Sequence, residues 1–289
     1  HHKHWAWIDA SVQAYIDAII LERMARVLDE KALVDELTSE IGLLNHNINA
    51  LMWNGEQQFY QDTGPDGRFS PAKSIAAYWS LLAERLIPPE RLTPFVQHLR
   101  DTWSFKVDHC IPSLSADSEG YNSLTGNQWR GAVWPDLTYL VLRGLQNASE
   151  PELAHLLACN HIDTVCRVHE TTGRFWENYA PEDLGPGDPS DQDQTGLTGM
   201  VVVATMLENI LGISLDWPLR QVTWHRQLKR DRDFGVRNFP LGHEGRMDLI
   251  VSGESIQIQT DIPFTLIIRN GREIVQSAVS SDSFTISMD

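Results

Sequence analysis

The segment Gln128–Pro135 holds the densest group of side chains that could bind a ligand. Trp129 and Trp134 flank Arg130 at the junction between a loop and a helix, and Tyr121 precedes them. Flat indole faces match the apolar C–H faces of sugars, whereas a guanidinium and amide groups match their hydroxyls. The segment therefore indicates a carbohydrate site. The alternative interpretation is that both tryptophans are core residues.

The segment Phe175–Tyr179 places a carboxylate among aromatic side chains. Glu177 follows Trp176 and precedes Asn178. Partial desolvation raises the pKa of a carboxyl group, and this environment suits a catalytic acid or base. The alternative interpretation is a surface glutamate at a turn.

Other kinds of chemical site have no support in the sequence. The loop 188–193 contains three aspartates, but it lacks the glycine and glutamate spacing of a calcium loop, so we expect it to be solvated. His155 and His161 are not at a metal-ligand spacing, and we interpret both as structural. Nucleotide-binding loops, the nucleophile elbow and the zinc-protease motif do not occur. We therefore expect neither a metal nor a cofactor.

Composition narrows the classes of partner. The 289 residues carry a formal charge of −16, which disfavours nucleic acid and anionic membranes, although solubility alone could explain it. No apolar run reaches the roughly 18 residues of a membrane span. The first residues lack the pattern of a signal peptide and a helix follows at once, so we expect the chain to begin inside a domain.

Helical periodicity covers most of the chain before Gly212. Apolar residues recur at helical spacing over seven stretches, namely 5–28, 30–53, 71–87, 89–101, 134–145, 149–169 and 198–211. Long polar loops interrupt them at 102–127 and 180–194. Paired helices with long loops on one side indicate a mainly α toroid or solenoid. Gly212 follows the last helix as a C-terminal cap would.

The pattern changes after Trp217. Apolar and polar residues then alternate, as in 247–251 and 264–268, and Asn270-Gly271 is a hairpin signal. We therefore expect a helical domain over 1–216 and a small antiparallel β-domain, resembling a sandwich, over 217–289.

Taken in order, several segments resemble one group of enzymes. Ile111–Ser115, Tyr121, Trp129–Pro135 and Trp176–Tyr179 are similar to motifs of the (α/α)6-barrel glycoside hydrolases, which include trehalase, processing α-glucosidase and mannosylglycerate hydrolases. The resemblance implies a toroid of six helical hairpins. About seven helices are expected here, so we expect an incomplete toroid and a separate N-terminal fragment of the same protein as a partner.

The resemblance also implies roles for individual residues. Glu177 matches the general base of an inverting, exo-acting enzyme for α-linked glucosyl or mannosyl substrates. The implied substrate-binding residues are Trp129, Arg130, Trp134, Trp176, Asn178, Tyr179 and Tyr121. The general acid lies in a Ser-Gly-x-Asp-like motif that this sequence lacks, so we expect the acid outside this chain. Residues 195–199 also lack an aromatic residue that the group often has at this place, so the identity of the sugar stays open.

Two other functions remain open. One is a carbohydrate-binding or structural relic without activity, and the other is a protein-binding α-solenoid with tryptophans along an extended concave face. If part of a toroid is absent, its first helix should lack neighbours on one flank. We then expect Trp5, Trp7, Ile8 and Ile16 to be exposed beyond what a core pattern allows.

Overall fold

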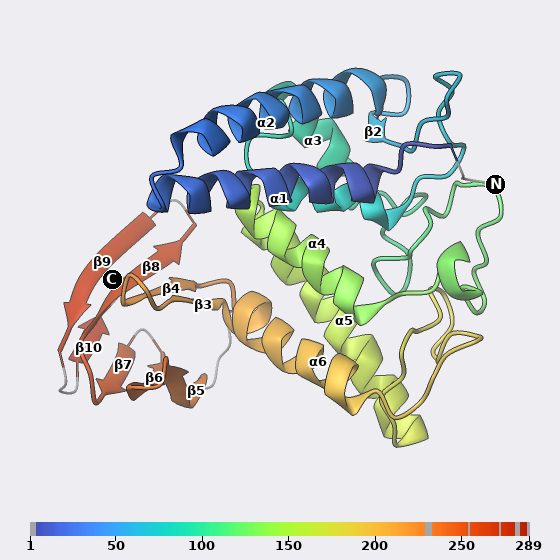
Figure 1. Cartoon of the computed structure of the whole chain (residues 1–289). Helices are drawn as coiled ribbons and strands as arrows, with labels where there is room; N and C mark the ends of the chain where they lie inside the picture. Colours follow the sequence, from blue (N-terminus) through green and yellow to red (C-terminus); the bar gives the residue numbers. More distant parts are fainter. Residues whose placement is uncertain (1–3, 229–232, 254, 272, 281–283, 288–289) are drawn as a thin grey trace. The chain divides into compact units, whose positions relative to one another are not determined.

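Helices build the N-terminal part of the chain and strands build the C-terminal part (Figure 1). The computed structural model describes residues 4–228, 233–253, 255–271, 273–280 and 284–287. Two compact units result, 1–202 and 203–289. The boundary falls inside the last helical segment, where α6 (Met200–Thr205) continues into a π-helical turn, η4 (Met206–Leu211).

The first unit begins with a helical hairpin. The helices α1 (Ile8–Val27) and α2 (Lys31–Leu51) lie side by side, and the backbone N–H of Ile8 donates to Asp62 Oδ1 at 2.8 Å, which fixes the start of α1. Both predicted helices are confirmed. The expected exposure is confirmed for Trp7, but Trp5 and Ile16 are half-buried, and the expectation is wrong for Ile8, which is buried in one helical row with Val12.

An aromatic core follows the hairpin. The short strands β1 (Trp53–Asn54) and β2 (Phe59–Tyr60) lead into η1 (Ile75–Leu82) and α3 (Pro89–Gln97). Their buried rings and that of Phe105 pack edge to face, tilted or stacked, and Phe59, Tyr60, Tyr78, Phe95 and Phe105 form the group. The helix predicted over 71–87 is present as a shorter 3-10 helix, in which the Ser80 hydroxyl donates to the Ala77 carbonyl.

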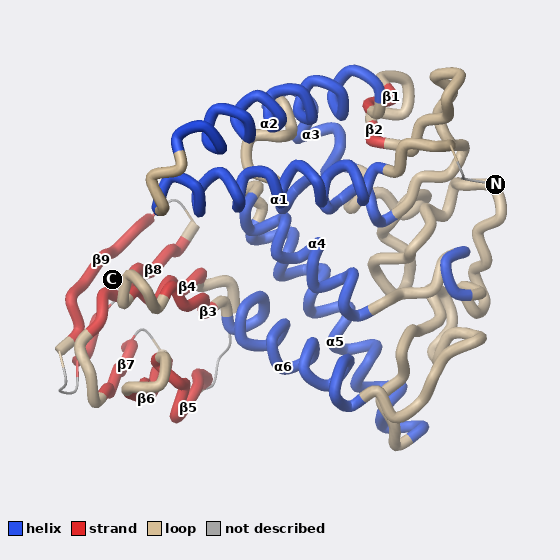
Figure 2. The backbone as a smooth tube through the Cα atoms, in the orientation of Figure 1, coloured by secondary structure: helices blue, strands red, loops and turns tan. Residues whose placement is uncertain are grey.

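Two longer helices complete the helical unit. They are α4 (Pro135–Asn147) and α5 (Pro151–Thr172), preceded by the 3-10 turn η2 (Gln128–Arg130) and followed by the π-helical turn η3 (Thr195–Gly199). A Cβ at Gly144 would lie 2.6 Å from Leu81 Cβ, so a glycine lets α4 approach η1 closely. In this unit the long loops gather at the end where α1 begins and α2 ends (Figure 2).

The second unit consists of two four-stranded sheets. One has the order β10-β7-β6-β5 and the other β3-β4-β8-β9. Their bounds are β3 (Ile213–Asp216), β4 (Gln221–His225), β5 (Phe234–Leu241), β6 (Gly245–Ser252), β7 (Ser255–Thr260), β8 (Phe264–Asn270), β9 (Glu273–Val279) and β10 (Phe284–Ser287). The inward residues alternate along β6, where Met247, Leu249 and Val251 are buried, and they pack around Trp224.

The predicted antiparallel β-domain is therefore present, with one difference. The strands β4 and β8 pair in parallel, whereas all other described strand pairs are antiparallel. Gly212 adopts a left-handed φ of 87° as the cap before β3, and a Cβ there would lie 2.0 Å from the His225 carbonyl oxygen. The predicted cap is confirmed. None of the described helices combines the length and apolarity that crossing a membrane requires.

Candidate active site

Four irregular segments lie side by side at the loop end of the helical unit. Residues 73–75, 113–115, 131–133 and 177–180 are joined in that order by backbone hydrogen bonds of 2.9–3.0 Å. We call this arrangement the backbone ladder. It brings the two segments that the sequence analysis selected, Trp129–Pro135 and Phe175–Tyr179, next to each other.

Glu177 lies on the outermost segment of the backbone ladder. Its backbone N–H donates to the Asp191 carbonyl at 2.8 Å, and its side chain is half-buried. The neighbouring Trp176 is held from two sides, because its indole N–H donates to Thr172 Oγ1 at 3.1 Å and its carbonyl accepts the Thr198 hydroxyl at 2.7 Å. The bonds of Trp176 and of the Glu177 backbone N–H therefore hold in place the segment that carries the Glu177 carboxylate.

The two tryptophans of the first segment stack on each other. The ring centroids of Trp129 and Trp134 are 4.3 Å apart and their planes differ by 5°. Trp129 is 58% exposed, whereas Trp134 is 9% exposed and its buried Nε1 has no hydrogen-bond partner among the described residues. Trp134 therefore supports the stack from below, and Trp129 is the indole that offers area to a ligand.

Arg130 and Tyr121 are fixed by the loop before η2. The Arg130 Nε–H donates to the Gly120 carbonyl at 2.8 Å, and the Tyr121 hydroxyl donates to Glu182 Oε1 at 2.8 Å. Burial, and then the Glu182 carboxylate, raise the pKa of Tyr121, which keeps its proton on that bond. Gly131 has a φ of 137°, and a Cβ there would lie 2.8 Å from the Tyr121 ring. Glu182 was not predicted from the sequence, because no local pattern links it to Tyr121.

The side chains of Asn178 and Tyr179, which follow Glu177 in the chain, are fully buried. The backbone N–H of Asn178 donates to Ser190 Oγ at 3.1 Å, and its side-chain amide donates to the Pro189 carbonyl at 3.3 Å. The Tyr179 hydroxyl accepts the Trp176 backbone N–H at 3.2 Å, and burial raises the pKa of Tyr179 to about 12. Both side chains therefore hold neighbouring loops, and in this structure their contacts lie within the protein.

A pair of buried histidines supports Tyr179 from the other side. His109 Nε2 and His161 Nδ1 are 2.9 Å apart, and the His109 ring packs edge-on against Tyr179 at 5.7 Å. Burial lowers the pKa of both imidazoles, in His161 to about 4, so the pair is neutral at pH 7. This agrees with a structural role for His161. The sequence analysis did not connect His109 with it.

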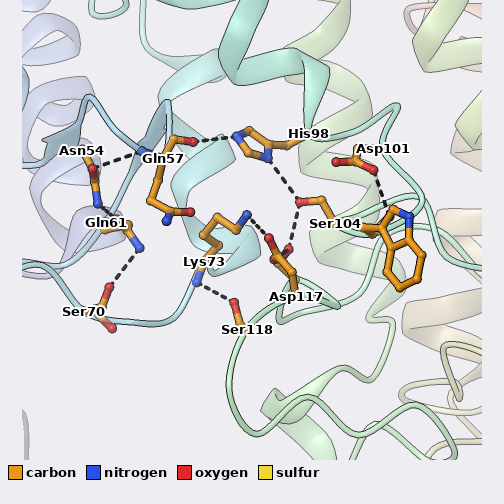
Figure 3. Close-up of polar contacts among 12 residues, drawn as sticks. Asn54, Gln57, Gln61, Ser70, Lys73, His98, Asp101, Ser104, Asp117 and Ser118 are labelled. Atoms are coloured by element: carbon orange, nitrogen blue, oxygen red, sulfur yellow. Dashed lines mark hydrogen bonds and ion pairs between the residues drawn. The ribbon is translucent and has the colours of Figure 1, made fainter.

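The inner edge of the backbone ladder carries a buried ammonium. Lys73 Nζ contacts Asp117 Oδ2 (Figure 3). The other Asp117 oxygen accepts the Ser115 hydroxyl. The Lys73 side chain is 6% exposed, whereas that of Asp117 is 42% exposed. The ion pair thus ties the loop after residue 115 to the backbone ladder.

Metal-binding groups are absent from the part of the chain that the structure describes, where no cluster of three His, Cys, Asp or Glu side chains could hold an ion. The aspartates at 188, 191 and 193 are exposed, and Asp193 pairs with Arg174 at 2.7 Å. The site therefore consists of one half-buried carboxylate, one exposed indole on a supporting stack, and fixed polar groups around them. Such a set can bind a sugar ring and accept a proton from water.

Comparison with known proteins extends these observations. Residues 1–195 match the family model described as the mannosylglycerate hydrolase MGH1-like glycoside hydrolase domain. A probable mannosyl-oligosaccharide glucosidase from Schizosaccharomyces pombe is 29% identical over 197 residues, which cover 63% of this chain and 24% of that protein.

Solved structures show the fold. A GH63 mannosylglycerate hydrolase from Thermus thermophilus matches with a TM-score of 0.56 and 21% identity over 70% of this chain and 45% of that chain. A neutral trehalase from Saccharomyces cerevisiae matches with a TM-score of 0.59 and 16% identity over 71% of this chain and 38% of that chain. The helical part thus has the (α/α)6-toroid fold. The chain spans less than half of the length of these proteins, in agreement with an incomplete toroid.

Proposed function

The chain belongs to the mannosylglycerate hydrolase MGH1-like glycoside hydrolase family, and from this premise we propose that it supplies the general base and a sugar platform of an inverting, exo-acting glycosidase. The substrates are α-linked glucosyl or mannosyl di- or oligosaccharides or glycosides. The names of the family and of the glucosidase relative support these sugars.

The observation that carries the proposal is the position of Glu177. Glu177 is half-buried, and its segment pairs through Tyr179 with Val133, which directly precedes Trp134 of the Trp129–Trp134 stack. An inverting enzyme needs a carboxylate that removes a proton from water while the water attacks the anomeric carbon, and a second carboxyl, roughly 6.5–9.5 Å away, that protonates the leaving oxygen. Glu177 takes the first role.

The remaining groups bind and position. The exposed face of Trp129 stacks on the apolar face of a sugar ring, and the guanidinium N–H groups of Arg130 that do not bind Gly120 are donors for its hydroxyls. Trp176 adds a second platform beside the base. Tyr121 contributes through its bond to Glu182, whereas Asn178 and Tyr179 act by holding the Glu177 segment in place.

We further propose that an N-terminal segment outside these residues completes the toroid and brings the general acid. The exposed side chains of Ile20, Leu21 and Met24 along α1 support this idea, because a helix flank of this kind is normally covered in a soluble protein. We expect the chain to co-purify with an N-terminal segment of a relative. In that complex the solvent-accessible area of α1 should be smaller than in the chain alone.

The experiment is an isosteric substitution in the complete protein. Glu177→Gln should lower turnover by about 10²–10⁴-fold, because the amide cannot accept the proton, and it should leave the thermal unfolding midpoint unchanged. Glu170→Gln is the matched control, since Glu170 is an exposed carboxylate on α5. Near-normal turnover of the Glu177 variant removes it from the mechanism. Proton NMR of the first product tests inversion, which should give the β-anomer from an α-linked substrate.

An inactive carbohydrate-binding protein is the second candidate. The absence of a Ser-Gly-x-Asp-like motif from the sequence favours it. Saccharide binding without turnover, in a protein that includes its upstream segment, would support this candidate against the enzyme.

A further inference from the structure

An open cavity lies outside the candidate active site. It has a volume of about 480 Å³ and is formed by the turn between β1 and β2 and the C-terminal end of α3. Three glutamines line it, Gln57, Gln58 and Gln97, together with Arg100 and Asp101. Side-chain amides both donate and accept hydrogen bonds, which is what neighbouring sugar hydroxyls require.

An exposed indole follows the lining segment of this cavity in the chain. Trp103 follows the lining residue Thr102 and is 79% exposed, more than Trp129 in the candidate active site. The backbone of Trp103 is held in a turn, because its N–H donates to Asp101 Oδ1 at 2.9 Å and the Ser104 N–H donates to the Asp101 carbonyl at 3.0 Å. On the far side, Phe105 is fully buried and stacks on Phe59. The turn therefore carries an indole that is largely exposed to solvent.

The lining carries little net charge. Arg100 pairs with Glu150 at 2.8 Å, so its charge is compensated. His98 forms part of the wall, where its Nε2 bonds the Gln57 carbonyl at 2.9 Å and its Nδ1 bonds Ser104 Oγ at 3.3 Å (Figure 3). Burial lowers the pKa of His98, which keeps the imidazole neutral at pH 7. With Asp101 as the remaining charge, the cavity does not favour an anion.

We propose that this cavity and Trp103 form a second saccharide-binding site, which takes a neutral pyranose unit of an oligosaccharide. The indole stacks on the C–H face of the ring, and the three glutamines with Arg100 bond its hydroxyls. One aromatic face and a few hydrogen bonds give weak binding, with a Kd on the order of millimolar. The site goes beyond the proposed hydrolysis, since it would bind sugar in an inactive protein as well.

The test is a titration of the 289-residue chain in the Trp129→Ala background, which removes the exposed indole of the candidate active site and leaves Trp176 in place. Isothermal calorimetry or ligand-observed NMR with maltotriose, α-mannotriose and trehalose should detect binding of at least one of them. Adding Trp103→Ala should weaken that binding at least tenfold, and adding Gln97→Ala should weaken it several-fold. Leu124→Ala is the matched control, because Leu124 is a similarly exposed apolar side chain on another loop, and it should change nothing.

Two results overturn the proposal. One is that saccharide binding does not depend on Trp103, either because none of the three saccharides binds or because the Trp103 and Leu124 variants bind them equally well. The other is that choline or arginine binds in a manner that depends on Trp103 while the saccharides do not, which would make the site a cation site of the indole and Asp101. Neither result depends on Glu177, so failure here is distinct from failure of the proposed hydrolysis.

Discussion

Gly187→Ala should destabilise the helical unit by overpacking the site from behind. A Cβ at Gly187 would lie 1.9 Å from Asn178 Oδ1 and 3.1 Å from the Thr125 carbonyl oxygen. Asn178 is fully buried, and turning its amide away would break its bond to the Pro189 carbonyl. Overpacking costs about 1–3 kcal/mol, and a broken buried hydrogen bond costs about 1–3 kcal/mol more. We therefore expect a loss of about 3 kcal/mol in the free energy of unfolding.

The assay is thermal unfolding followed by near-UV circular dichroism, with Gly185→Ala as the control in the same loop. A Cβ at Gly185 meets no atom within 4 Å, so its midpoint should stay within about 2 °C of the wild type. For a domain of this size the Gly187 variant should melt about 6–12 °C lower. Equal midpoints for the two variants would refute the idea that Asn178 is tightly packed. In the complete protein, the Gly187 variant should also lose turnover, because Asn178 adjoins Glu177.

Two further predictions concern buried charge. The pKa of both His109 and His161 is lowered in the fold, so the unfolded chain binds protons that the fold excludes, and stability should fall as pH drops from about 6.5 toward 4. Each group contributes up to ~1.4 kcal/mol per pH unit to the free energy of unfolding. Measured by urea unfolding between pH 7 and 5, this free energy should fall less steeply with pH in His161→Gln than in the wild type. The same pH slope in both proteins would contradict the prediction. Asp117→Asn should lower the thermal midpoint more than Lys73→Met, because it leaves a buried ammonium unpaired, and the reverse order would count against it.

Periodicity predicted the elements whose burial is one-sided. Buried residues recur at helical spacing along α1, at Ile8, Val12 and Tyr15, and every second residue is buried along β6. Both elements could therefore be predicted from the sequence. The 3-10 form of Ile75–Leu82 could not, because its apolar spacing does not separate an α-helix from a 3-10 helix. The parallel pairing of β4 with β8 was missed for a different reason, since it depends on chain topology and not on local alternation.

The candidate site was predictable where chemistry is local and hidden where it is not. The mixture of aromatic residues with Glu177 and Arg130 could be recognised within a few residues. The burial of Trp134 under Trp129 could not be predicted. Both are tryptophans of the same short segment, and only the folded structure shows which of the two indoles is exposed. The bond of Tyr121 to Glu182 and the pair of His109 with His161 join residues far apart in sequence, and no short-range pattern encodes them.

The backbone ladder makes the site a late product of folding. Its four segments are separated in sequence by η1 and α3, by a long loop, and by α4 and α5. Each pairing between two of these segments therefore closes a long stretch of chain. The loss of chain entropy on closure opposes the pairing until other contacts offset it. The helical hairpins can assemble from neighbouring contacts, whereas Glu177 reaches its place only after residues 73–180 have been brought together. A nascent chain that ends before Glu177 would be rich in helix and still lack the outermost segment of the ladder.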